Sequence, residues 1–182
     1  MSFDGQALVT LALDAGFTHA AVADAAALSP QQEVRDMCIA NTCRRYDTCW
    51  AGPPACGTLE ECTARLRRYD TVLMVQTVGQ LEDSLDFDGM RETRQRFEAT
   101  LQALLPQMRE RYPDVLPLGA GCCTICDPCA YPDAPCRFPE KAITSMEAYG
   151  LWVSRSCTDC GLQYNYGPNT LAFTGCFLLC RG

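Results

Sequence analysis

A run of closely spaced cysteines near the middle of the chain most constrains how it can fold. Its spacing is C-x2-C-x2-C-x6-C, formed by Cys123, Cys126, Cys129 and Cys136. Three cysteines this close bring their sulfurs together only where the backbone wraps around a bound group, and the fourth completes a set of four thiolates. These four residues are therefore predicted to be metal ligands.

The spacing favours a [4Fe–4S] cluster over a zinc ion. The C-x2-C-x2-C-x3-C-P run of bacterial ferredoxins follows the same logic and binds iron–sulfur clusters. Structural zinc sites instead use two separated pairs of ligands, so a four-thiolate zinc site is the alternative. Arg137 directly follows Cys136. It is predicted to be a cofactor-binding residue whose charge offsets that of the thiolates, so Arg137→Ala should lower the reduction potential.

A second set of cysteines lies between residues 38 and 62, and it contains no C-x2-C pair. Cys62 falls inside a predicted helix, where a buried cysteine behaves as a small apolar residue. The other four are predicted to hold a second cluster, with reduced buried thiols as the alternative: Cys38, Cys43, Cys49 and Cys56. Cys122 cannot easily reach the same cluster as its neighbour Cys123, and it is either unused or part of another site.

The third set is C-x2-C-x15-C-x3-C, formed by Cys157, Cys160, Cys176 and Cys180. This spacing comes close to a zinc pattern. A third cluster and unliganded thiols remain equally compatible with it.

Fourteen cysteines in 182 residues would suggest disulfides in a secreted chain. The first residues lack the basic and apolar regions of a signal peptide, and no apolar run reaches membrane-spanning length. We therefore expect a cytoplasmic protein whose thiols stay reduced, without a membrane partner, in a host that lives with little oxygen. The net charge of −7 argues against nucleic acid as a partner.

Hydrophobic periodicity and turn signals predict a loose alternation of helices and strands. Asp4 and Thr58 are predicted helix caps, Thr58 in a capping box with Glu61. Helices are expected over residues 4–15, 29–38, 58–68, 88–112 and 141–149, and strands over residues 19–23, 70–78, 115–118, 151–154 and 169–179. The expected fold is α/β (α+β): a single layered domain over residues 1–182, with a mixed sheet flanked by helices and by cysteine-rich cluster-binding loops.

Other kinds of chemistry find little support in the chain. His19 is the only histidine, which argues against a Cys–His nucleophile pair. No glycine-rich phosphate-binding pattern appears, so nucleotide binding is not indicated.

The chain resembles an uncharacterised family of predicted metal-binding proteins, domain-of-unknown-function family 2284. The resemblance covers most of the chain. It is densest over residues 123–150 and includes Cys38-x4-Cys43-x2-Tyr46 and Pro53-Pro54. It implies metal binding, with iron–sulfur the expected chemistry, and no established activity. The family pattern usually has a cysteine before the Pro-Pro pair, where this chain has Gly52, so Cys49 or Cys56 is the expected substitute.

The sequence as a whole predicts an iron–sulfur protein with at least one [4Fe–4S] cluster that transfers electrons to a redox partner protein. One alternative is a redox enzyme whose incompletely ligated cluster binds substrate. Another is an interaction module stabilised by zinc.

Overall fold

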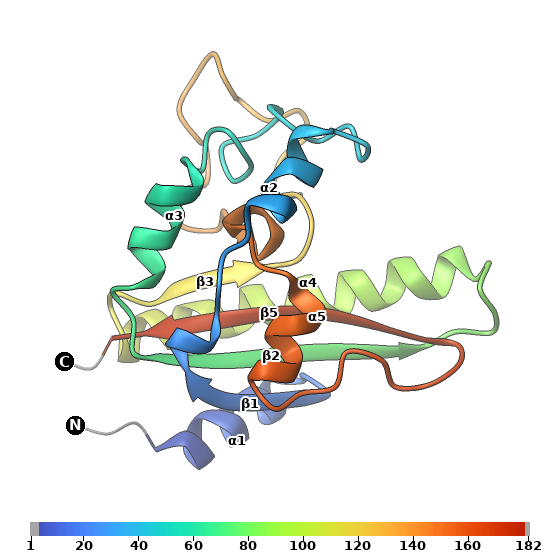
Figure 1. The fold of residues 1–182 in the computed structure, drawn as a ribbon. Coiled ribbons are helices and arrows are strands. Elements are labelled where there is room, and N and C mark those ends of the chain that lie inside the picture. Colours follow the sequence, from blue (N-terminus) through green and yellow to red (C-terminus); the bar gives the residue numbers. More distant parts are fainter. Residues whose placement is uncertain (1–3, 181–182) are drawn as a thin grey trace.

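A five-stranded mixed sheet forms the centre of the computed structural model, which describes residues 4–180 (Figure 1). The strand order is β1-β2-β5-β3-β4, with antiparallel pairing everywhere except between β3 and β4. The strands are β1 (His19–Asp24), β2 (Thr71–Gln80), β3 (Leu116–Gly119), β4 (Thr144–Ser145) and β5 (Thr170–Leu179).

Helices cover both faces of this sheet. α1 and the long α4 pack on one face, and α3, α5 and the short η2 pack on the other. The helices are α1 (Gly5–Ala15), η1 (Ala25–Ala27), α2 (Gln32–Ile39), α3 (Leu59–Leu66), α4 (Phe87–Arg111), η2 (Glu147–Tyr149) and α5 (Val153–Asp159). The expected mixed sheet flanked by helices is confirmed.

The interior strand β2 shows that the sheet has two apolar faces. Leu73 and Val75 belong to the core under α4, whereas Val72 and Met74 belong to the core under α3 and α5. Successive residues of a strand point to opposite faces, so a strand buried on both sides reads as a continuous apolar run. The run in β2 is such a case.

Two of the expected helix starts are confirmed atom by atom. The Asp4 carboxylate accepts a hydrogen bond from the backbone N–H of Ala7, 3.1 Å away. Thr58 and Glu61 form the capping box in both directions, at 3.2 Å and 2.8 Å. Each cap satisfies amide groups that a helix leaves free in its first turn.

The helix predicted over residues 141–149 is wrong. Thr144 and Ser145 pair with Leu118 and Gly119 as the edge strand β4, and one 3-10 turn, η2, follows. The β-branched Thr144 suits a strand, and pairing with β3 outweighs local helix propensity.

Two further boundary predictions are also wrong. Residues 151–154 were expected to form a strand, but Leu151 makes a single bridge to Pro30, and α5 begins at Val153. The helix α2 begins at Gln32 and not near Ser29, and Pro30 takes part in that bridge instead. A short apolar run does not distinguish strand from helix by periodicity alone.

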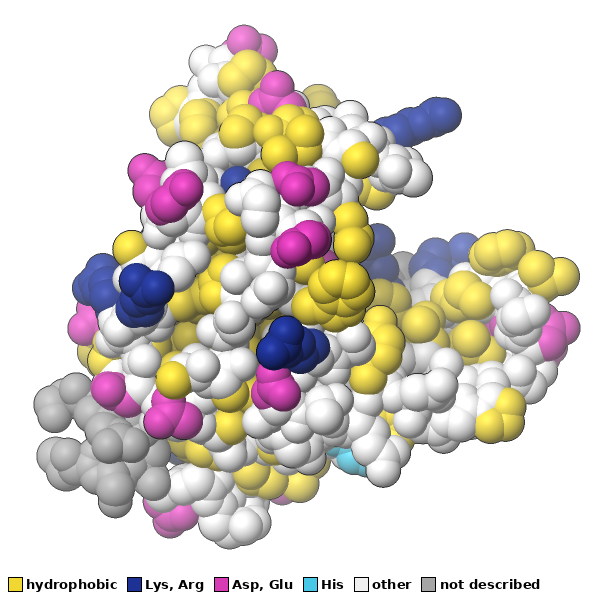
Figure 2. Space-filling model, viewed as in Figure 1, with side chains coloured by type: hydrophobic (Ala, Val, Ile, Leu, Met, Phe, Trp, Pro, Cys, Tyr) yellow, Lys and Arg dark blue, Asp and Glu magenta, His cyan; other side chains and the backbone are white. Residues whose placement is uncertain are grey.

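The loop after α2 and the loop after β3, which carry most of the first two sets of cysteines, lie together at one end of the molecule, beyond α2 and α3 (Figure 1). At another extremity, hydrophobic atoms gather near the turn from β2 to α4 (Figure 2), where Leu85 and Phe87 are 70% and 68% exposed. Within residues 4–180, no helix combines the length and the apolar character needed to cross a bilayer.

Candidate metal centre

Two loops that are about 80 residues apart in the chain form the candidate site. The indole N–H of Trp50 donates to the carbonyl oxygen of Ala134 at 2.9 Å, and the Tyr131 hydroxyl bonds to Asp47. The rings of Trp50 and Tyr131 meet edge to face, with centroids 4.9 Å apart. These contacts hold the loop after α2 against the loop after β3.

A cavity of about 640 Å³ opens between these loops, and six cysteine side chains line it. Arg45 and Arg94 contribute the basic groups of its wall. The six cysteines are Cys43, Cys49, Cys122, Cys123, Cys126 and Cys129.

Cys123 lies close to other thiols of the predicted cluster loop. Burial raises the pKa of its thiol, and the nearby Cys49, Cys126 and Cys136 add to this rise. Cys136 therefore lies within electrostatic range of Cys123, although it also lines a separate shallow pocket beside Trp50.

Burial makes three of the six thiols that line the cavity hard to ionise, those of Cys49, Cys122 and Cys123. It raises the pKa of Cys49, and it raises that of Cys122 to about 11. At neutral pH such thiols are protonated when no cation is near, and a bound metal would displace their protons.

Cys129 differs from the other thiols of the loop. Burial raises its pKa, but the backbone N–H groups of Tyr131, Trp50 and Ala130 and the Cys126 thiol outweigh that effect, so its pKa is lowered. Hydrogen bonds to the charged form of an acid favour ionisation. The backbone around Cys129 thus favours the thiolate form of its side chain.

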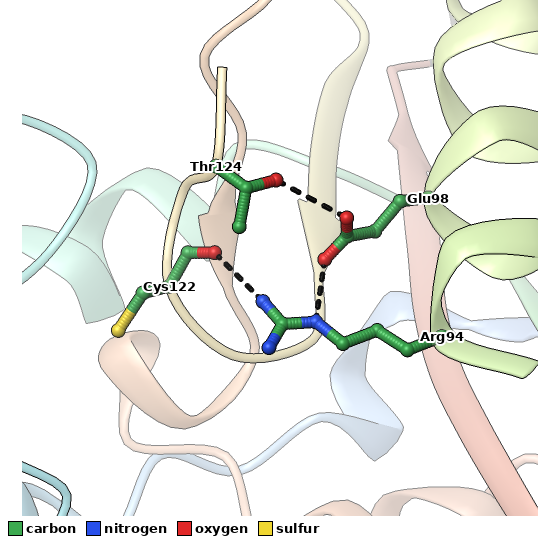
Figure 3. A network of polar contacts seen from close by, with 4 residues as sticks. All are labelled: Arg94, Glu98, Cys122 and Thr124. Atoms are coloured by element: carbon green, nitrogen blue, oxygen red, sulfur yellow. Dashed lines mark hydrogen bonds and ion pairs between the residues drawn. The ribbon is translucent and has the colours of Figure 1, made fainter. Parts of the chain in front are cut away.

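A polar network anchors the start of the cysteine loop to α4 (Figure 3). The Arg94 guanidinium pairs with the Glu98 carboxylate at 2.7 Å and also donates to the carbonyl oxygen of Cys122 at 3.5 Å. The other oxygen of Glu98 accepts from the Thr124 hydroxyl at 3.1 Å. Glu98 therefore fixes both Arg94 and Thr124.

Glu98→Ala is expected to loosen this anchor. Losing about 1 kcal/mol of hydrogen bonding should increase amide hydrogen exchange over residues 121–125 about fivefold. Hydrogen exchange with mass spectrometry measures it, and Glu92→Ala, exposed on the same helix, is the control. Equal exchange in the two variants would contradict the role given to Glu98.

Arg137 lies at the other end of the loop. Its side chain is exposed, and its guanidinium donates to the carbonyl oxygen of Pro128. This bond joins the residue after Cys136 to the residue before Cys129 and so closes the loop.

The structure divides the second predicted set of cysteines. Cys43 and Cys49 line the cavity, whereas Cys56 lies against Cys62 and accepts a hydrogen bond from the Arg35 guanidinium at 3.6 Å. Cys38 lies between these groups, since both Cys43 and Cys56 affect its pKa, which burial raises.

Charge is shared unevenly between Cys56 and Cys62. The hydrogen bond from the Cys62 thiol, helped by the Arg35 guanidinium, overcomes the effect of burial and lowers the pKa of Cys56 to about 6. The same hydrogen bond raises the pKa of Cys62 far above its ordinary value. Cys56 is thus the thiolate of the pair and Cys62 the thiol.

Three members of the third set lie together in the apolar core under α5: Cys157, Cys160 and Cys176. Burial raises the pKa of all three thiols, that of Cys160 to about 11. Cys180 lies apart, with its thiol 3.1 Å from the carbonyl oxygen of Arg68. It lies four positions beyond Cys176, and four positions of a strand span about 13 Å.

Within residues 4–180, no three Cys, His, Asp or Glu side chains converge closely enough to hold a single metal ion. The thiols are instead spread around the wall of a cavity. Thiolates are soft ligands, so this donor set fits a group that is bound through sulfur.

Sequence reasoning missed three residues of this region. Arg45 and Arg94 carried no spacing signal, and Cys62 was set aside because it falls in a helix. The predicted capping box at Thr58 was the available signal for Cys62. It places Cys62 near the start of α3, on the side that faces the core and the residues just before the cap.

The fold and the thiol-lined cavity define a cysteine-rich metal-binding protein of the α/β class. The family model described as "Predicted metal-binding protein (DUF2284)" matches residues 21–179. The chain therefore belongs to this family, as the resemblance implied. No curated protein and no solved structure matches the chain.

Proposed function

We propose that this protein holds a [4Fe–4S] cluster in the cavity between the two loops and works as an electron carrier. The proposed ligands are Cys123, Cys126, Cys129 and Cys136. The observation that carries the proposal is the cavity of about 640 Å³ lined by six cysteines, three of them proposed ligands, with Cys136 close enough to raise the pKa of Cys123. When bound, such a cluster gains and loses one electron at a time.

The surroundings of the proposed ligands support a charged sulfur group. Backbone N–H groups point at Cys129, and N–H bonds to sulfur are a main control of cluster potential. Arg45 on the wall and Arg137 beside the loop supply positive charge, whereas the charge of Arg94 is paired with Glu98. Cations at this position offset the negative charge of thiolate ligands.

Gly52 stands where the family pattern has a cysteine. Its surroundings indicate which cysteine of this chain is the substitute. A Cβ atom placed on Gly52 would lie 3.2 Å from the Cys49 sulfur. The N–H groups of Ala51, Cys123 and Gly52 also point at that sulfur. This proximity supports Cys49, and not Cys56, as the substitute, and makes Cys43, Cys49 and Cys122 the candidates for a second cluster.

Reversible reduction tests the electron-carrier function. Protein purified without oxygen should show a broad visible absorption that dithionite bleaches and that returns on reoxidation. The expected change is the gain of one electron per cluster, read by redox titration. A colourless protein, or colour that reduction does not change, would contradict the proposal.

Arg137→Ala is expected to lower the reduction potential on the order of tens of millivolts. A nearby cation favours the more negative, reduced form of a cluster, and solvent screens an exposed arginine. Redox titration gives the potential, with Arg91→Ala as the control, since Arg91 is exposed and paired with Asp88 on α4. An unchanged potential would refute the role of Arg137.

A second candidate function is a redox enzyme whose substrate binds in the same cavity. Cys43, Cys49 and Cys122 exceed the needs of one four-thiolate cluster, and Arg45 and Arg94 could bind an anion. A site of this kind should change its visible spectrum when cyanide or a small thiol is added. An electron carrier with a fully ligated cluster should not.

A reducing cytoplasm and a redox partner protein complete the proposal. All 14 cysteines are free thiols in the structure, and buried free thiols persist where the compartment is reducing. Acidic side chains are scattered over the face shown in Figure 2, in keeping with the net charge of −7. A partner with a basic docking face would complement this charge.

A further inference from the structure

Cys56 and Cys62 form a close pair outside the cavity. The Cys62 thiol lies 3.8 Å from the carbonyl oxygen of Cys56, and both residues are buried, with 0% and 8% of their surfaces exposed. Cys62 is on the first turn of α3, and Cys56 lies two residues before its cap at Thr58. The capping box therefore fixes the turn that brings the two side chains together.

Two arginines hold positive charge against this pair. Arg35 donates to the Cys56 sulfur at 3.6 Å, and Arg65 lies 3.9 Å from the Cys62 sulfur. Charge-assisted hydrogen bonds to sulfur stabilise a thiolate in a buried site. This environment favours one ionised and one protonated sulfur.

The arginines do not depend on the sulfurs for their other hydrogen bonds. Arg35 also donates to the carbonyl oxygens of Gly57, at 2.6 Å, and Ala148. Arg65 donates to the carbonyl oxygen of Cys56 and to the Tyr149 hydroxyl. Both guanidinium groups thus keep oxygen partners when the sulfurs lose their charge, so oxidation of the pair does not leave a buried guanidinium without a hydrogen-bond acceptor.

We propose that Cys56 and Cys62 are a reversible dithiol–disulfide couple, a two-electron redox site separate from the cavity. The oxidant is a low-molecular-weight disulfide. This inference does not require a cluster, and it adds a second kind of redox chemistry to the chain.

The reaction balances as two thiol–disulfide exchanges. The Cys56 thiolate attacks one sulfur of the small disulfide, whose S–S bond breaks and releases a thiolate. Cys62 then gives up its proton and attacks the Cys56 sulfur, which releases the second thiolate. The small disulfide gains two electrons and becomes one thiol, which takes the proton from Cys62, and one thiolate, while the protein gains one disulfide.

The order of the two steps follows from exposure and charge. Cys56 retains some surface in contact with solvent and lies against Arg35, whereas Cys62 is fully enclosed. Cys56 is therefore the attacking sulfur and Cys62 the resolving one.

Equilibration with glutathione tests this proposal. Protein purified without oxygen is incubated at increasing ratios of oxidised to reduced glutathione, quenched in acid, alkylated and analysed by peptide mass spectrometry. We expect a single disulfide joining Cys56 to Cys62, reversed by reduced glutathione, with a two-electron dependence on the ratio. A Cys38–Cys56 disulfide, mixed pairings, or no disulfide would overturn the proposal.

Two variants sharpen the test. Cys62→Ser should trap glutathione on Cys56, because the resolving sulfur is gone, and labelling elsewhere would contradict the assigned order. Arg65→Gln should shift the equilibrium about tenfold toward the disulfide, since it removes a charge that stabilises the reduced pair. Arg67→Gln, an exposed neighbour, should leave the equilibrium unchanged. Iron measured on the same samples reports the cluster separately.

Discussion

Cys123→Ser is expected to leave the protein with less than about a tenth of its bound iron. Losing a hydrogen bond to a ligand already lowers metal affinity about 10–100-fold, and losing the ligand itself should lower it more. Cys123 is central to the effect, since Cys49, Cys126 and Cys136 all lie within electrostatic range of it. Iron and acid-labile sulfide per chain, measured after anaerobic purification, give the result.

The matched control is Cys180→Ser. Cys180 contacts the carbonyl oxygen of Arg68 at the far end of β5 and does not line the cavity. Its replacement should preserve the iron and sulfide content. An equal loss of iron in both variants, or none in Cys123→Ser, would place the iron somewhere other than the proposed loop.

Phe97→Ala is expected to destabilise the fold by about 3–5 kcal/mol, the usual cost of emptying a buried aromatic site. Phe97 is fully buried, and its ring centroid lies 6.1 Å from those of both Phe17 and Phe173. It joins α4, which carries Arg94 and Glu98, to the sheet.

Urea unfolding under reducing conditions measures this loss as a lower midpoint. Phe87→Ala is the control, because Phe87 is on the same helix and 68% exposed, so its change should stay within about 0.5 kcal/mol. Similar midpoints in the two variants would contradict the packing of α4 described here.

Local signals in the sequence predicted those parts of the fold that local interactions decide. Asp4 and Thr58 cap helices because a short side chain reaches amides three residues away. The run of β-branched and apolar residues over 70–78 predicted the strand β2. These features need no knowledge of distant residues.

Tertiary pairing decided what the sequence could not. Thr144 and Ser145 form an edge strand only because Leu118 and Gly119 lie beside them. Leu151 makes only an isolated bridge to Pro30 and is not part of any strand of the sheet. Residues 26 or more positions apart determine these states, and a local window does not contain them.

The grouping of the cysteines shows the same limit. The spacing of Cys43, Cys49 and Cys56 gave no indication that two would line the cavity and the third would lie beside Cys62. The separation of Cys176 from Cys180 was foreseeable, because four residues of a strand span about 13 Å. A C-x3-C pair converges on a helix and not on a strand.

The most direct test of the central claim is the elemental content of the native protein. After anaerobic purification, iron, zinc and acid-labile sulfide are measured per chain. A cluster held by Cys123, Cys126, Cys129 and Cys136 predicts iron and sulfide in equal amounts, with little zinc. Zinc without iron or sulfide would contradict the proposed iron–sulfur function.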